Sequence, residues 1–231
     1  PTRELYRGLN ERVLGTRLIV WPEAALPELA NEAQDFLKQV YAAGHEHGSD
    51  ILMGVVRAEG EDYYNSILAL GDTVAFYDKR HLVPFGEFVP GRDYLDWVSA
   101  LDQVPRDNVS GDEVGIFEVA GHQVGNVICF ESAFGSTYRD TVEAGAEVVV
   151  VQTNNRSYRR SANTEQHVAL SQMRAVETGR PVLHASISGI TAAIAADGTI
   201  EATTQIFETT VLAGTATTMT GETPYLRFGD W

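Results

Sequence analysis

The feature that most constrains the fold is the mixture of hairpin turns and helical crossovers between short apolar segments. Turn-forming residues such as Gly71-Asp72 and Asp197-Gly198 separate three pairs of these segments, which predicts antiparallel hairpins. The predicted pairs are 64–70 with 73–77, 116–119 with 123–129 around Ala120-Gly121-His122, and 190–195 with 199–204. Each pair is expected to form neighbouring strands of a sheet.

Helical patterns alternate with the remaining strands. Helices are predicted over 5–13, 29–43, 136–143 and 164–178, and further strands over 17–21, 51–56 and 147–152. Gly44, Gly145 and Gly179 each follow a predicted helix, where glycine commonly ends one, and Pro181 begins another strand. A sheet that combines hairpins with crossovers and carries helices on its outer faces predicts a layered α/β sandwich.

Composition supports one globular domain over residues 1–231. Hydrophobic residues make up 44% of the 231-residue chain, and no repeat or Pro/Gly/Ser-rich linker divides it. The 32 acidic and 17 basic side chains give a net charge of −15, which disfavours nucleic acid as the main partner. The single cysteine cannot form an internal disulfide.

Cys129, that single cysteine, stands where a predicted strand meets a helix-forming stretch. Such a junction exposes a side chain at the sheet edge, offers backbone N–H groups to an anion, and lowers a thiol pKa. A buried, inert thiol is the alternative for a lone cysteine. Which of these two descriptions holds for Cys129 depends on the residues that lie near it in the fold.

Two further ionisable residues also follow predicted strands. Glu23 comes directly after Trp21-Pro22, and Lys79 follows the strand 73–77. Alone, each fits a helix start or a solvated loop. If the three strand ends meet at one edge, Glu23 would take the proton of Cys129, Lys79 would stabilise an oxyanion, and the thiolate would attack an acyl carbon.

The sequence around these residues resembles a known family. The matching sequence motifs are WPEAALP (21–27), YDKRHLVPFGE (77–87), ICFE (128–131), RAVETGRP (174–181), SGI (188–190) and TPYLRFGDW (223–231). They are similar to the carbon–nitrogen hydrolase (nitrilase) superfamily, and within it to the apolipoprotein N-acyltransferase branch. The similarity runs through most of the chain.

This resemblance implies a four-layer αββα sandwich and assigns residues to roles. It implies that Glu23 is the general base, that Lys79 stabilises the oxyanion, and that Cys129 is the nucleophile that forms a thioacyl enzyme. Glu87 and Glu131 match two further acidic positions near this triad. Neither a metal nor another cofactor is implied, and the His45-Glu46-His47 word lacks a third ligand.

The implied reaction is the last step of bacterial lipoprotein maturation. It moves an acyl chain from a phospholipid to the α-amine of a diacylglyceryl-cysteine apolipoprotein. The family carries membrane helices on both sides of this domain and a core strand before residues 5–13. We therefore expect the chain to be the extracytoplasmic catalytic portion of an inner-membrane enzyme, without those segments.

Three features depart from the family pattern or bear on substrate binding. Phe130 stands where the family usually has tyrosine. The loop containing Arg156, Tyr158 and Arg159 either binds a phospholipid phosphate or is simply solvated. The aromatic stretch 88–98, with Trp97, either covers the substrate as a lid or packs on the core.

Two other functions remain open. A soluble amidase would use the same triad, with water as the second nucleophile and a small amide as the substrate. A catalytically inactive domain that only binds lipid or lipoprotein is the other alternative, and the intact Glu23, Lys79 and Cys129 argue against it. Serine hydrolase chemistry lacks support, because no Gly-x-Ser-x-Gly word is present.

Overall fold

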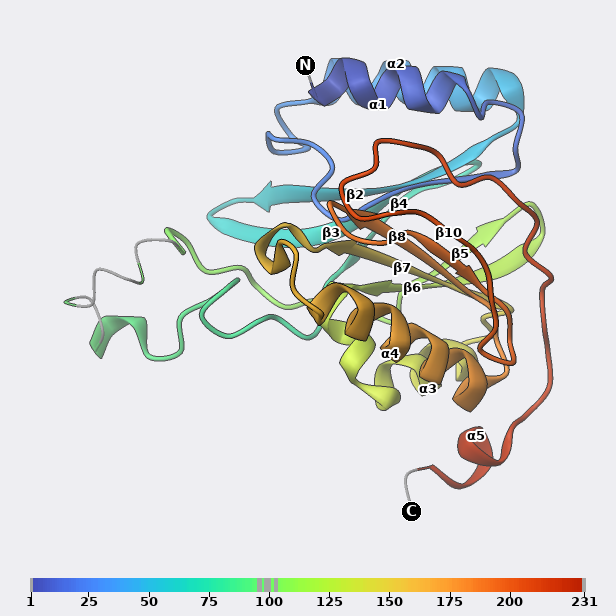
Figure 1. The fold of residues 1–231 in the computed structure, drawn as a ribbon. Coiled ribbons are helices and arrows are strands. Elements are labelled where there is room, and N and C mark those ends of the chain that lie inside the picture. The colour runs from blue at the N-terminus through green and yellow to red at the C-terminus, as the bar shows by residue number, and fades with distance from the viewer. Residues whose placement is uncertain (1, 95–96, 98–100, 102–103, 230–231) are drawn as a thin grey trace.

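In a computed structural model of the chain, which describes residues 2–94, 97, 101 and 104–229, two β-sheets pack face to face with helices outside (Figure 1). The first sheet consists of β1 (Leu18–Trp21), β2 (Asp50–Glu59), β3 (Asp62–Leu70) and β4 (Val74–Asp78), in the order β1-β2-β3-β4. β1 and β2 are parallel, and the other neighbours are antiparallel. The carboxyl ends of β1 and β4 therefore lie at the same end of this sheet.

The second sheet has the order β10-β9-β8-β7-β6-β5. Its strands are β5 (Ile116–Val119), β6 (His122–Ile128), β7 (Val148–Asn154), β8 (Val182–Ile187), β9 (Ala192–Ile194) and β10 (Ile200–Thr203). The three central strands β6, β7 and β8 are parallel, so their carboxyl ends lie together. All three predicted hairpins are present as β3–β4, β5–β6 and β9–β10.

Helices cover the outer face of each sheet. α1 (Thr2–Glu11) and α2 (Gln34–His47) lie on the first sheet, and α3 (Gly135–Glu143) and α4 (Asn163–Thr178) lie on the second (Figure 1). α5 (Pro224–Phe228) follows a long irregular segment and contacts α4. The predicted layered sandwich is thus confirmed as an αββα arrangement. No helix in the part of the chain described has the length and hydrophobicity to cross a bilayer.

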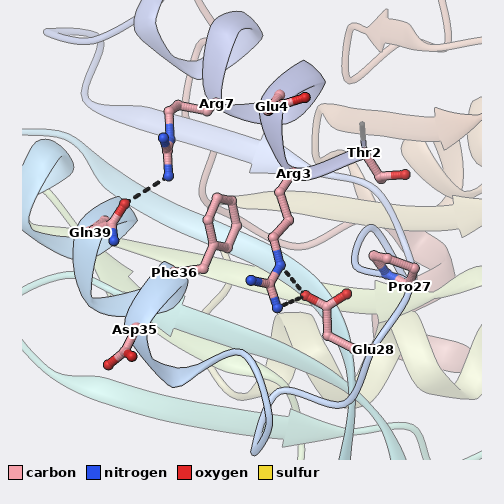
Figure 2. A pocket seen from close by; sticks show the side chains of 9 residues that line it. All are labelled: Thr2, Arg3, Glu4, Arg7, Pro27, Glu28, Asp35, Phe36 and Gln39. Atoms are coloured by element: carbon pink, nitrogen blue, oxygen red, sulfur yellow. Dashed lines mark hydrogen bonds and ion pairs between the residues drawn. The ribbon is translucent and has the colours of Figure 1, made fainter.

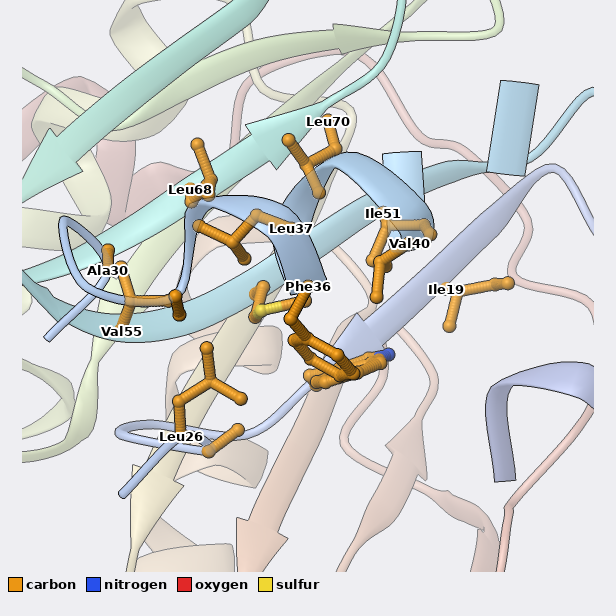
Figure 3. Packing of buried hydrophobic residues seen from close by; sticks show 14 residues of the cluster. Ile19, Leu26, Ala30, Phe36, Leu37, Val40, Ile51, Val55, Leu68 and Leu70 are labelled. Carbon is orange, nitrogen blue, oxygen red and sulfur yellow. The ribbon is translucent and has the colours of Figure 1, made fainter. Parts of the chain in front are cut away.

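Three apolar clusters hold the layers together. Phe36, Leu37 and Val40 of α2 pack against Ile51 and other residues of the first sheet (Figure 3). A second cluster joins α3 and α4 to the second sheet. Between the sheets the third cluster contains Leu52, Ile67, Ala69, Tyr77, Val119, Val124, Ile128, Val148 and Val150, all buried.

The predicted helix over 29–43 is wrong at both ends. α2 begins at Gln34 and runs to His47, so Gly44 lies inside it. A Cβ at Gly44 would lie 2.8 Å from the backbone oxygen of Ser49, so glycine serves close packing there rather than ending the helix. Gly48 ends it instead, with a left-handed φ of 67°.

The hairpin before Cys129 also differs in detail. Its turn contains two residues, Ala120 and Gly121, whose φ values are 51° and 80°, as a type I′ turn requires. β6 ends at Ile128 rather than at Cys129. Cys129 itself has a φ of 50° and opens the 3₁₀ turn η3 (Cys129–Ala133), because a left-handed residue cannot continue the strand.

Gly54 of β2 allows the chain after β1 to approach the sheet closely. A Cβ at this position would lie 2.3 Å from the Pro22 oxygen and 2.5 Å from the Glu23 Cα. The Ala25 N–H also donates to the Gly54 carbonyl over 2.9 Å. The position of Glu23 therefore depends on the absence of a side chain at residue 54.

We predict that Gly54→Ala lowers the free energy of unfolding by about 1 to 3 kcal/mol, because the added methyl group overlaps backbone atoms. Urea unfolding followed by circular dichroism measures this change. Gly8→Ala is the matched control: a Cβ at Gly8 of α1 meets nothing within 4 Å. That control should raise stability by about 0.5 to 1 kcal/mol. Equal stability of both variants would contradict the close approach at Gly54.

Candidate active site

The three predicted catalytic residues follow three different strands and lie together between the two sheets. Glu23 follows β1, Lys79 follows β4, and Cys129 follows β6. Lys79 Nζ lies 3.4 Å from Glu23 Oε1, and both side chains are buried. Lys79 and Glu23 also exert electrostatic effects on the Cys129 thiol, which places the sulfur beside them.

Lys79 is held between two carboxylates. Its Nζ lies 2.8 Å from Glu87 Oε2, closer than it lies to Glu23, and its side chain is 1% exposed. Burial alone would lower the pKa of Lys79, but the charges of Glu23 and Glu87 outweigh it, so the pKa is raised. Lys79 is therefore a buried cation at neutral pH, and Glu87 is in direct contact with it.

Asn65 of β3 fixes the spacing of these two carboxylates. Its Nδ2 donates to Glu23 Oε1 and to Glu87 Oε1, over 2.7 Å in each case. The second oxygen of Glu23 accepts from the Asn154 N–H over 2.7 Å, which ties the first sheet to the end of β7. Glu87 also accepts from the Val83 N–H over 2.8 Å. These bonds leave both carboxylates little freedom to rotate.

Cys129 is held as a protonated thiol in a strained backbone conformation. Burial and then the charge of Glu23 raise the pKa of the Cys129 thiol to about 12. The Lys79 ammonium, the Thr153 hydroxyl and the Asn154 N–H lower that pKa, because each stabilises a thiolate. The left-handed φ of 50° costs a non-glycine residue about 1 to 2 kcal/mol. The site thus combines a protonated thiol with the carboxylate of Glu23, whose charge acts on it.

Glu131 does not contact the triad side chains but joins the segments that carry them. Its carboxylate is fully buried and accepts from Tyr77 Oη over 2.8 Å and from the Ile128 N–H over 2.8 Å. It also accepts from the Arg80 N–H over 2.7 Å and the His81 N–H over 3.1 Å. Glu131 thereby fastens the residues after Lys79 to the turn that contains Cys129.

Phe130 lies at the surface beside this turn. Its side chain is 37% exposed, and its ring meets Phe134 edge-on with 5.1 Å between centroids. The Phe134 ring in turn stacks on His81 at 4.4 Å. Phe130, Phe134 and His81 thus form a row of ring contacts. Phe130 has no hydroxyl to offer the site.

The four predicted substrate-binding residues are not all near the triad. Tyr158 is half-buried, and its ring meets that of His167 edge-on with 6.4 Å between centroids. Burial, followed by the charges near it, raises the pKa of Tyr158. Arg156 and Arg159 are exposed on the loop after β7. Trp97 is 79% exposed, with Nε1 donating to the Tyr94 carbonyl over 3.3 Å.

Trp97 belongs to the segment that projects from the sandwich after β4 (Figure 1). An ion pair at 2.5 Å between Arg92 and Asp107 joins the two halves of this segment. Residues 95, 96 and 98 of the predicted lid lie outside the described residues, as do residues 230–231 of the last matching word. The alternative that the aromatic stretch packs on the core is wrong for Tyr94 and Trp97, which are 85% and 79% exposed.

Sequence reasoning missed three polar residues of the site. Asn65 is buried in β3 next to a mostly apolar stretch, Thr153 lies in β7, and His167 lies on α4. His167 Nε2 is 3.2 Å from the Cys129 carbonyl oxygen. The signal for Asn65 was available, because a buried amide in an apolar strand needs partners. Nothing local in the sequence relates His167 to Cys129, 38 residues earlier.

A surface pocket of about 480 Å³ lies elsewhere, between α1 and α2 (Figure 2). Its lining contains Thr2, Arg3, Glu4, Arg7, Pro27, Glu28, Asp35, Phe36 and Gln39. Arg3 pairs with Glu28, and Arg7 donates to Gln39 over 2.7 Å, so its guanidinium groups are already engaged. The pocket shares no residue with the triad. Within the described ranges, no group of three His, Cys, Asp or Glu side chains could hold a metal.

Solved structures of other proteins show which type of fold this chain has. A carbon-nitrogen hydrolase superfamily protein from Xanthomonas campestris, with an arsenic adduct in its active site, aligns with a TM-score of 0.69 and 20% identity. The alignment covers 89% of this chain and 80% of that one. A Nesterenkonia amidase from the nitrilase superfamily aligns with a TM-score of 0.68 and 16% identity, with the same coverage. The fold is therefore of the nitrilase type.

Sequence comparison identifies the family. The family model described as carbon-nitrogen hydrolase matches residues 2–225, and the chain belongs to this family. Proteins named apolipoprotein N-acyltransferase are similar over the whole chain, with 38% identity in Methylococcus capsulatus and 35% in Photobacterium profundum. The alignments cover 46% and 47% of those proteins, so the chain spans about half the length of these relatives.

We predict that Glu131→Gln lowers the free energy of unfolding by about 2 to 3 kcal/mol, because the amide cannot accept from all the donors that the carboxylate satisfies. Chemical unfolding at pH 7 measures the change. Glu118→Gln, at an exposed position of β5, is the control and should stay within about 0.5 kcal/mol of the parent. The same small effect at both positions would show that Glu131 does not fasten the two segments.

Proposed function

We propose that this domain transfers an acyl group through a thioester on Cys129, with Glu23 as the general base and Lys79 as the oxyanion-stabilising residue. The observation that carries the proposal is the buried Lys79 ammonium, held by two carboxylates beside a thiol on a strained turn. A fixed positive charge of this kind stabilises an anion without reorganising during the reaction.

The first half of the reaction loads the enzyme. Glu23 takes the proton of the Cys129 thiol, and the sulfur attacks the carbonyl carbon of an acyl ester. Lys79 stabilises the tetrahedral oxyanion. When the intermediate collapses, the C–O ester bond breaks, and the protonated Glu23 gives its proton to the leaving alkoxide. The products are an alcohol and a thioester.

The second half transfers the acyl group to an amine. The amine nitrogen attacks the thioester carbon, Lys79 again stabilises the oxyanion, and Glu23 accepts a proton from the nitrogen. The C–S bond then breaks, and the proton returns to the sulfur. An amide forms and the thiol is regenerated. Two steps through a thioester lower the barrier, because a thioester reacts with an amine more readily than an ester does.

The names of the relatives support the substrates that we propose. Proteins similar to this chain along its whole length are named apolipoprotein N-acyltransferase. We assign a phospholipid as the acyl donor and the α-amine of a diacylglyceryl-cysteine apolipoprotein as the acceptor. The catalytic domain would then work at the extracytoplasmic face of the inner membrane, anchored by segments outside the printed chain.

Exposed aromatic and basic residues suit such a donor. Trp97 and Tyr94 project from the main body on the segment after β4, where they can enter a lipid surface. Arg156 and Arg159 are exposed on the loop after β7, and guanidinium groups bind phosphate in bidentate fashion. We assign these residues and the half-buried Tyr158 to donor binding.

The test is intact-protein mass spectrometry of the full-length, detergent-solubilised protein after incubation with a phospholipid but no acceptor. A mass gain of one acyl chain, released by hydroxylamine, is expected from the parent and is absent in Cys129→Ala. Lys79→Met should slow its formation by about 100-fold or more, as loss of an oxyanion donor does.

Two results would overturn this function. Acylation of Cys129→Ala at the parental rate would remove the nucleophile from the proposal. An adduct that forms from a small amide but not from phospholipid would identify a hydrolase with the same triad instead. Urea unfolding of both variants serves as the control for intact folding.

A further inference from the structure

The nucleophile sits on a turn that its own backbone does not favour. Cys129 adopts a left-handed φ of 50° although it is not glycine. Such conformations persist where the surroundings fix them. Glu131 holds the residue before Cys129 through the Ile128 N–H, and Arg174 holds the carbonyls of Ser132 and Ala133 after it. The carbonyl of Cys129 itself faces a different partner.

That partner is the imidazole of His167. Its Nε2 lies 3.2 Å from the Cys129 carbonyl oxygen and 2.8 Å from Ser132 Oγ. His167 projects from α4 and is 4% exposed, so its ring is buried beneath the surface. The ring therefore meets the strained turn at the carbonyl of the nucleophile.

The other ring nitrogen faces the groups around the sulfur. His167 Nδ1 lies 3.1 Å from Asn155 Oδ1 and 3.5 Å from Thr153 Oγ1. The Thr153 hydroxyl itself donates to Asn155 Oδ1 over 3.0 Å.

The neutral state of the imidazole decides which nitrogen can hold the turn. Burial lowers the pKa of His167, which keeps the ring neutral, so that one nitrogen donates and the other accepts. With the proton on Nε2, His167 donates to the Cys129 carbonyl oxygen. With the proton on Nδ1, Nε2 would be an acceptor and could not hold that carbonyl.

We propose that His167 is a positioning residue for the Cys129 nucleophile, which holds the carbonyl of the left-handed turn by donating to it from Nε2. The inference rests on the function proposed above and adds a residue that does not touch the substrate.

The test measures acyl transfer and stability for His167→Ala and His167→Gln in the full-length enzyme. His167→Ala should lower kcat by about 10-fold to 100-fold with little change in the donor KM, because the sulfur is misplaced while the binding surface is kept. His167→Gln should restore most of kcat, since its amide can reach the carbonyl of Cys129.

His184→Ala is the matched control. Its ring packs edge-on against His167 at 4.9 Å, is fully buried, and hydrogen-bonds Ser171 rather than the Cys129 turn. This variant should lose stability as His167→Ala does but keep kcat within about threefold, because the groups that orient the sulfur remain in place. Equal losses of kcat in both alanine variants, or no rescue by glutamine, would overturn the positioning role.

If parental transfer proceeds in Cys129→Ala, the proposed function itself fails, whereas parental kcat in His167→Ala removes only this inference.

Discussion

The ammonium of Lys79 is buried between the carboxylates of Glu23 and Glu87, and the arrangement of the site depends on this interaction. A buried cation needs compensating charge, and the two carboxylates together provide more than one unit of it. Asn65 and backbone N–H groups share the remaining negative charge. The segments that carry Glu23, Lys79 and Glu87 therefore have to meet between the two sheets.

The surrounding fold brings these groups within reach. The carboxyl ends of β1 and β4 lie at the same end of the first sheet. The small volume of Gly54 lets the residues after β1 approach this sheet closely. In the second sheet, the parallel strands β6 and β7 bring Cys129 and Asn154 to the opposing edge. Glu131 then fastens the chain after Lys79 to the Cys129 turn. Glu23, Lys79 and Cys129 lie far apart in the sequence but become neighbours because the ends of their strands converge.

Much of this was predictable, for identifiable reasons. Turn residues with a local geometric requirement, such as Gly71-Asp72 and Asp197-Gly198, predicted the hairpins correctly. The positions of Glu23, Lys79 and Cys129 directly after strands indicated that these residues could converge. The end of α2 was wrong because Gly44 is required by packing, which a local pattern does not reveal. Asn65, Thr153 and His167 were missed because their roles arise from contacts between distant segments. The positions of Arg156 and Trp97 relative to the site likewise depend on how exposed loops are placed.

The most direct test of the central claim is a charge-removal series read by chemical unfolding at pH 7. Lys79→Met alone should lower the free energy of unfolding by about 3 to 5 kcal/mol, because it leaves two buried carboxylates without their cation. Adding Glu23→Gln and Glu87→Gln to that variant should recover most of the loss, since the site then buries no unpaired charge. A triple variant no more stable than Lys79→Met would contradict the claim that this buried charge cluster organises the site.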